Sequence, residues 1–214
     1  MAHILVVGAS HGIGLETVKA ALAAGHQVRA LARSARDIPI DDAHLEKING
    51  DATDKATLID ALIGINAVIM TLGVKPSAAR IVSGTNLFST ATRALVDTMD
   101  ETGVRRLVAV TGIGAGDSRG HGGAFYDWLF FPMILKRVYD DKDIQERMIT
   151  NSDLEWTIVR PGLLTNGAFT GRYRVLVDPV TWHADSISRA DVADFLVKEV
   201  AENAYVGKTP VVVS

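Results

Sequence analysis

The stretch that decides the fold is His3-Ile4-Leu5-Val6-Val7-Gly8-Ala9-Ser10-His11-Gly12-Ile13-Gly14. Its residues 4–7 are a short run of branched apolar side chains, which is typical of a strand buried on both faces. Gly8, Gly12 and Gly14 follow, and a helical pattern begins at once. In a dinucleotide-binding turn, such glycines bend the chain, admit a pyrophosphate close to the backbone and let the helix pack on the strand. The helix N-terminus offers free N–H groups and partial positive charge to the phosphates.

The same turn allows two other interpretations. Residues 8–12 also fit Gly-x-Ser-x-Gly, the strand–turn–helix elbow of serine hydrolases, in which Ser10 would be the nucleophile and would need a downstream acid and histidine. That elbow normally follows the strands that supply the oxyanion loop, whereas only a few residues precede it here. A third interpretation is a tight turn that binds nothing. The downstream sequence favours the dinucleotide turn, in which Ser10, His11 and Ile13 bind the cofactor together with the three glycines.

Composition excludes several classes of protein. The 214 residues suit one α/β domain with a full core, so we expect a single NAD(P)-binding domain over residues 1–214. A net charge of −3 gives no field that attracts nucleic acid or anionic lipid. The absence of cysteine excludes disulfides and thiolate catalysis, and the six histidines lack ligand spacing, so we expect no metal site.

Location and partners follow from the apolar segments. The longest apolar run, 128–135, is interrupted by Pro132 and too short to span a bilayer. The first strand begins within two or three residues of the N-terminus, which leaves no room for a signal peptide. We therefore expect a cytoplasmic protein without membrane or nucleic-acid partners, acting on a small-molecule substrate as a monomer or small homo-oligomer.

Strand and helix patterns alternate along the chain. This alternation predicts an α/β protein with a Rossmann-type doubly wound, mainly parallel sheet and helices on both faces. Residues 172–178 look extended, and Ser188 and Asp191 predict a capping box. The expected strands are 4–7, 27–32, 45–49, 67–70, 106–110, 155–159 and 210–213, and the expected helices are 12–24, 55–62, 86–102, 135–150 and 189–201.

The residue after the second expected strand selects the cofactor. In βαβ units, an acidic residue about twenty positions beyond the glycines holds the ribose 2′-OH and selects NAD. Arg33 occupies this place, Arg36 follows, and the first acid is Asp37. An arginine can clamp a 2′-phosphate, although a solvated basic loop would have the same sequence. The sequence therefore predicts NADP(H).

Two further loops are expected to touch the nucleotide. Asp51 and Ala52 follow the third strand, where Asp51 could accept a hydrogen bond from the adenine amino group. Its simpler role is to form the turn before helix 55–62, which Asp54 would cap. Leu72 and Gly73 follow the fourth strand, and a glycine there lets the backbone approach the ribose.

The loop after the fifth strand is expected to face the substrate. Residues 111–123 are rich in glycine and polar residues, and the stretch 125–131 is strongly aromatic. This order suits a pocket wall or lid, with core packing or an oligomer contact as equal alternatives. We expect loops 111–135 and 161–187 to build the substrate pocket.

Motifs of one family are spread over nearly the whole chain: Gly8-x-x-x-Gly12-x-Gly14, Arg33, 50–54 (GDATD), 110–112 (VTG), Lys142 with Glu146, 156–162 (WTIVRPG) and 187–193 (ISRADVA). In this ordered set the chain resembles the short-chain dehydrogenase/reductases, in particular the atypical group with NmrA-like proteins and biliverdin-IXβ/flavin reductase. The resemblance implies an NADPH-dependent reductase in which Lys142 holds the nicotinamide ribose. It also implies that the nicotinamide lies between two segments, Thr111–Gly112 and Pro161, Gly162, Leu163 and Leu164.

The sequence departs from that family at the proton donor. Tyrosine-dependent members carry a tyrosine four residues before the lysine, whereas Val138 occupies this place and Tyr139 is one residue closer. A one-residue slip rotates a helical side chain by about 100°, which predicts that Tyr139 turns away from the substrate. Thr111 is the candidate replacement for the family's serine, and Leu163 stands where biliverdin-IXβ reductases have a histidine. Lys142, Thr111 and Tyr139 remain the catalytic candidates.

An incomplete donor set favours acceptors that take hydride and draw protons from water, because the protein then contributes mainly orientation. We therefore predict an oxidoreductase that delivers hydride from NADPH to a flat conjugated acceptor, flavin- or quinone-like. The alternative is an NADP-binding sensor or regulatory protein of the NmrA-like type, without turnover.

Overall fold

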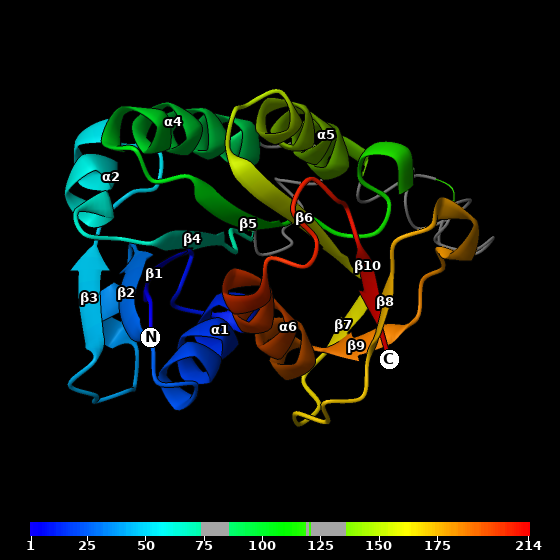
Figure 1. The fold of residues 1–214 in the computed structure, drawn as a ribbon, viewed down its shortest axis with the longest axis horizontal. Coiled ribbons are helices and arrows are strands. Elements are labelled where there is room, and N and C mark those ends of the chain that lie inside the picture. The colour runs from blue at the N-terminus through cyan, green and yellow to red at the C-terminus, as the bar shows by residue number, and fades with distance from the viewer. Residues whose placement is uncertain (74–85, 119, 121–135) are drawn as a thin grey trace.

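The computed structural model describes residues 1–73, 86–118, 120 and 136–214. Its strands are β1 (His3–Val7), β2 (Gln27–Ala32), β3 (Leu45–Asn49), β4 (Ala67–Met70), β5 (Arg106–Val110), β6 (Glu155–Pro161), β7 (Leu163–Thr165), β8 (Arg174–Leu176), β9 (Ser186–Ser188) and β10 (Val211–Val213). Eight of them form one sheet in the order β3-β2-β1-β4-β5-β6-β10-β8 (Figure 1). All neighbours in it are parallel except β8, which runs antiparallel to β10. The predicted doubly wound, mainly parallel sheet is confirmed.

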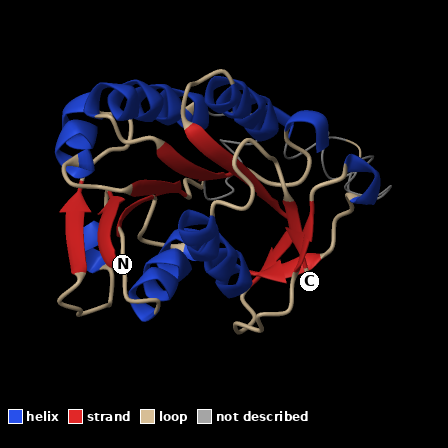
Figure 2. Ribbon diagram, viewed as in Figure 1, coloured by secondary structure: helices blue, strands red, loops and turns tan. Residues whose placement is uncertain are grey.

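Helices cover both faces of this sheet (Figure 2). The helices are α1 (Gly12–Ala23), α2 (Lys55–Leu62), α4 (Leu87–Thr102), α5 (Lys136–Thr150) and α6 (Arg189–Glu202). Figure 1 shows α2, α4 and α5 on one face and α1 with α6 on the other. Short 3₁₀ turns occur at Ala35–Asp37, Gly116–Ser118 and Pro179–Thr181. Among the described residues, no helix has the length and apolarity that crossing a bilayer would require.

The apolar side chains of β1 alternate between the two hydrophobic clusters on opposite faces of the sheet. Ile4 and Val6 pack in the cluster under α1 and α6, whereas Leu5 and Val7 pack in the cluster under α2 and α4. This alternation follows from the two-residue period of a strand, and all four side chains are fully buried. The strand predicted to be buried on both faces is thereby confirmed.

The structure differs from the predicted elements mainly near the C-terminal end. The extended segment expected over 172–178 contains only β8, and β6 continues two residues beyond the predicted end at Val159. The small parallel sheet of β7 and β9 was not predicted. The three side chains of β7 are exposed, so no buried apolar alternation marks that strand in the sequence.

Candidate functional site

The glycine turn joins β1 to α1 by contacts that no larger residue would permit. Gly8 has a φ of +88°, and a Cβ built on it would lie 3.0 Å from the carbonyl oxygen of Thr71. A Cβ on Gly14 would lie 2.2 Å from the carbonyl oxygen of Gly8. The contact at Gly14 is shorter than packing tolerates, and the contact at Gly8 is tight at a φ that L side chains rarely adopt. The end of β4 therefore lies against the turn, and the first turn of α1 packs directly on the end of β1.

The N-terminus of α1 is open to an anion. His11 precedes the helix in an extended conformation, makes no capping hydrogen bond through its side chain, and the first turn contains no acid. The N–H groups of the first helical residues have no acceptor within the helix, and the helix dipole is positive at this end. Gly12, with a φ of +58°, leaves the backbone approachable. This cradle, which a side chain would fill, fits the pyrophosphate of a dinucleotide.

The turn lacks the parts of a hydrolase. The hydroxyl of Ser10 lies 2.9 Å from Nδ1 of His11, its exposed neighbour in the chain. No carboxylate contacts His11 among the described residues, so no acid orients that ring. The geometry therefore gives no support to the interpretation of Ser10 as a nucleophile.

Arg33 and Asp51 lie at the same edge of the sheet. Ala32, the residue before Arg33, pairs with Asn49 in the register of β2 and β3. The N–H and hydroxyl of Thr53 donate to Oδ1 of Asp51 at 2.9 and 2.8 Å. These two hydrogen bonds hold the pKa of Asp51 below its ordinary value, and the charge of Arg33 acts in the same direction. Asp51 thus forms the predicted turn beside an exposed arginine that has no carboxylate partner among the described residues.

Two other predicted nucleotide contacts lie around the same end of the sheet. The N–H of Leu72 lies 3.1 Å from the Cβ position of Gly8, which places the end of β4 beside the glycine turn. Gly73 is exposed with open space around its Cβ position, and Ala52 is partly buried beside Asp51. Asp54 accepts from the N–H of Thr57 at 3.0 Å and caps α2, as predicted.

Lys142 lies at the C-terminal end of β5. Its Nζ donates to the carbonyl oxygen of Thr111 and lies 5.1 Å from the ring centroid of Phe88 and 5.4 Å from that of Tyr139. Burial lowers the pKa of Lys142 to about 8, and the negative charge of Glu146 opposes this shift. The ammonium group is thus held in a partly apolar setting, where it loses its proton more readily than in water.

Tyr139 lies beside Lys142 at the end of β5. A Cβ on Gly112 would lie 3.1 Å from the hydroxyl oxygen of Tyr139 and 3.9 Å from Nζ of Lys142. Residues three apart share one face of a helix, so both side chains of α5 reach the same point. Gly112 has no side chain and a φ of +146°, which leaves room for the phenol. The one-residue slip along α5 therefore does not separate the Tyr139 hydroxyl from Gly112 and Lys142.

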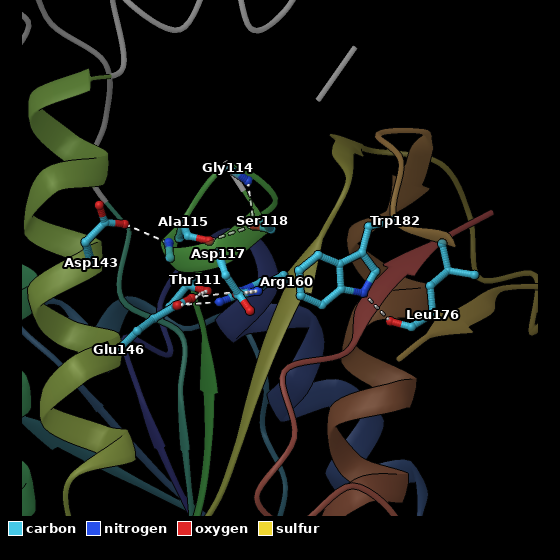
Figure 3. A network of polar contacts seen from close by, with 11 residues as sticks. Thr111, Gly114, Ala115, Asp117, Ser118, Asp143, Glu146, Arg160, Leu176 and Trp182 are labelled. Atoms are coloured by element: carbon cyan, nitrogen blue, oxygen red, sulfur yellow. Dashed lines mark hydrogen bonds and ion pairs between the residues drawn. The ribbon is translucent and has the colours of Figure 1, made fainter. Parts of the chain in front are cut away.

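A buried network holds the loop after β5 (Figure 3). The guanidinium of Arg160 is 2% exposed and donates to both carboxylate oxygens of Glu146, at 3.0 and 2.6 Å. A further nitrogen of Arg160 donates to Asp117 at 2.6 Å. The hydroxyl of Thr111 donates to Glu146 at 2.7 Å. Because its one proton is given to Glu146, Thr111 has none for a substrate in this arrangement, and it is a positioning residue.

The same network fixes Gly116. Its N–H donates to Asp143 at 2.7 Å, and a Cβ there would lie 2.3 Å from Oε2 of Glu146. The ring of Trp182 covers Arg160, whose guanidinium carbon lies 5.2 Å from the ring centroid (Figure 3). Sequence reasoning noted Glu146 and Arg160 only as parts of family motifs and missed their pairing. A buried arginine directly before Pro161 was the available signal, since such a charge requires a partner.

The loops after β5 and β6 are joined at the site. The N–H of Ile113 donates to the carbonyl oxygen of Pro161 at 3.1 Å, so Gly112 and Pro161 lie close together. A Cβ on Gly162 would lie 2.1 Å from the carbonyl oxygen of Asp185, which fixes that glycine. Leu163 and Leu164 follow with side chains 49% and 37% exposed. The aromatic stretch 125–131 lies outside the described residues, as do residues 119 and 121–135 of the predicted pocket loop 111–135.

A family model described as NAD(P)H-binding matches residues 8–203, and the chain belongs to this family. The predicted nicotinamide dinucleotide cofactor is thereby confirmed. The residues that would hold its pyrophosphate are those of the open turn at Gly8, Gly12 and Gly14. No group of acidic or histidine side chains suited to a metal ion occurs among the described residues.

One protein is similar to the chain in sequence, and two solved structures are similar to it in fold. Sterol demethylase protein B of Methylococcus capsulatus is 30% identical over 168 residues, which cover 75% of this chain and 51% of that protein. The chain thus spans about half the length of this relative. The structure of ChuY from Escherichia coli O157:H7, named an anaerobillin reductase, has a TM-score of 0.80 at 24% identity, covering 99% of this chain and 96% of that one. A short-chain dehydrogenase/reductase from Veillonella parvula, solved with NADP, has a TM-score of 0.81 at 17% identity, covering 100% and 94%. The two structures show that the chain shares the fold of these proteins.

Proposed function

We propose that this protein is an NADPH-dependent reductase that delivers hydride to a flat conjugated acceptor of the flavin or quinone type. The observation that carries the proposal is the position of Tyr139 and Lys142, whose polar atoms meet above Gly112 at the end of β5. In open α/β sheets, ligands bind outside the C-terminal ends of the strands, which is where these groups lie. Bound NADPH supplies the hydride, and the acceptor takes up one proton as well.

Tyr139 is the group best placed to deliver that proton. A phenol ordinarily holds its proton up to a pH of about 10, and a neighbouring cation makes the phenolate easier to form. Lys142 supplies this cation while its backbone contact with Thr111 holds it beside the phenol. We assign Lys142 two roles, which are to hold the nicotinamide ribose and to favour proton release by Tyr139.

The preference for a flat apolar acceptor rests on the exposed side chains beside these groups. Leu163 and Leu164 present apolar surface directly after Gly162, and no ionisable side chain stands at position 163. An extended conjugated ring can be held by such surface without a specific hydrogen-bonding partner. The Escherichia coli protein named an anaerobillin reductase has the same fold, which supports an acceptor of this class.

The preference for NADPH over NADH rests on Arg33. It is exposed after β2, has no carboxylate partner among the described residues, and lies close enough to Asp51 to lower its pKa. A guanidinium in this position can receive a 2′-phosphate, which NADH does not carry.

Turnover assays test the proposal directly. Purified protein is supplied with NADPH and, separately, FMN, quinones or dichlorophenolindophenol, and oxidation is followed at the nicotinamide absorbance band. We expect Tyr139→Phe to lower kcat by about 100-fold, the scale of one general acid. Tyr205→Phe is the matched control, since that ring packs against Phe195, on the α6 face of the sheet, and should leave kcat unchanged. NADPH binding without turnover on any acceptor would overturn the reductase and favour an NADP-binding sensor.

A further inference from the structure

A cation outside the predicted cofactor residues lies against the glycine turn. Arg189 is the first residue of α6, and its Nε and Cδ lie 3.8 and 4.0 Å from the Cβ position of Gly12. Gly12 is the turn residue at which the backbone is most approachable, because its own Cβ is missing. The guanidinium of Arg189 is therefore at the mouth of the cradle that fits the pyrophosphate.

Arg189 is held in place without being neutralised. One terminal nitrogen donates to the side-chain oxygen of Asn166 at 2.7 Å, which uses a single donor of the guanidinium. Arg189 forms no ion pair in the part of the chain that the structure describes. Nearby Asp191 could have been a partner, but its carboxylate accepts from Ser188, Thr170 and Gly171 instead. Arg189 thus has a full positive charge and free N–H donors.

We propose that Arg189 is a ligand of the cofactor pyrophosphate, closing the cradle beside the N-terminus of α1. Backbone N–H groups there offer partial charge, whereas a guanidinium offers a full charge and paired donors that match phosphate oxygens. Asn166 holds the guanidinium ready, so little side-chain freedom is lost on binding. The proposal builds on the proposed function only in taking an NAD(P)H dinucleotide as the ligand.

This assignment separates the roles of two arginines. Arg33 is expected to read the 2′-phosphate, which distinguishes NADPH from NADH. Arg189 is expected to contact the pyrophosphate, which both dinucleotides carry, so it sets overall affinity and not the preference between them. The two arginines follow different strands, β2 and β9, and can be removed independently.

Equilibrium binding of three ligands tests the proposal. Dissociation constants of NADPH, NADH and adenosine 2′-monophosphate, which lacks the pyrophosphate, are measured for the wild-type protein and for Arg189→Ala. We expect Arg189→Ala to weaken NADPH and NADH equally, by about tenfold, and to leave adenosine 2′-monophosphate unchanged. Arg189→Lys, which keeps the charge, should recover part of the loss. Arg147→Ala, which removes an exposed arginine of α5, is the control and should bind all three ligands as the wild type does.

Each other outcome has a defined meaning. Unchanged affinity of Arg189→Ala for both dinucleotides overturns the assignment. An equal loss for adenosine 2′-monophosphate also overturns it, because the substitution would then act through general damage to the domain. If Arg189→Ala does not fold, the comparison is made with Arg189→Lys and Asn166→Ala, which should each weaken the two dinucleotides selectively. Binding needs no turnover, so this result stands or falls separately from the reductase activity.

Discussion

The helices α1 and α5 flank the same sheet but bury opposite kinds of side chain. The buried residues of α1 are small or apolar, and they include Gly14, Val18 and Ala21. The buried side chains of α5 include Asp141, Gln145 and Glu146. The turn at α1 is therefore built mainly from backbone and close packing, to which the proposed pyrophosphate ligand Arg189 adds one side chain from α6. The end of the site at α5 is built from charged side chains joined across distant segments.

The largest loss of stability is expected when a buried charged side chain of α5 is removed. Glu146→Ala leaves the guanidinium of Arg160 buried with only Asp117 as a charged partner, and the free energy of unfolding should fall by about 3–5 kcal/mol. Chemical denaturation measures this loss. Asp117→Ala is the matched control: Asp117 is 69% exposed, and its loss should cost less than about 1 kcal/mol. Equal losses for the two variants would show that burial does not determine the strength of this network.

The next largest loss of stability is expected when the close packing of α1 on β1 is disturbed. Gly14→Ala places a Cβ 2.2 Å from the carbonyl oxygen of Gly8, and the required shift should cost about 3 kcal/mol of unfolding free energy. The affinity for NADPH should fall as well, because the shift moves the start of the helix. Gly73→Ala is the control, since its Cβ would have no neighbour within 4 Å among the described residues and stability should be unchanged. A stable Gly14→Ala protein would contradict the packing assigned to this turn.

A smaller effect is expected at the nucleotide's 2′-phosphate. Arg33→Ala removes one charge-assisted contact, worth on the order of 1.5–3 kcal/mol, so NADPH should bind at least tenfold more weakly while NADH binding changes little. Calorimetric titration of both dinucleotides measures the difference. Equal changes for NADPH and NADH would show that Arg33 does not contact the 2′-phosphate.

The last prediction is a pH dependence of stability at Lys142. The pKa of Lys142 is lowered to about 8 in the folded protein, against an ordinary value of 10.5. Between these values the unfolded chain binds more protons than the folded one, so the Lys142 contribution to stability rises from pH 8 to 10.5. Lys142→Met removes this contribution. The difference in unfolding free energy between the ligand-free wild type and this variant should therefore shift toward the wild type over that range, and a constant difference would contradict the lowered pKa.

The contacts of the two helices also differ in how well they could be predicted from the sequence. The glycine turn, β1 and α1 followed from local patterns, because glycine spacing and apolar runs express backbone geometry directly. The pairing of Glu146 with Arg160 joins α5 to β6, and no local pattern encodes which buried charges will meet. The contact of the Tyr139 hydroxyl with Gly112 could not be read from the sequence for the same reason, since spacing within one helix does not fix its relation to β5. Local geometry was therefore predictable, and contacts between distant side chains were not.

The polar inner face of α5 has a consequence for the order of folding. Asp141 accepts hydrogen bonds from Phe88 and Ser89 at the start of α4, so this part of α5 gains stability only once α4 is in place. An apolar helix face is stabilised by burial in many arrangements, because the hydrophobic effect has no direction. A hydrogen-bonded face is stabilised only in the arrangement that brings its partners into place. We expect α5 to dock late and to open first, and its amide protons to exchange with solvent through smaller fluctuations than those of α1. Such local opening would uncover Lys142 and Tyr139 while the dinucleotide cradle stays folded.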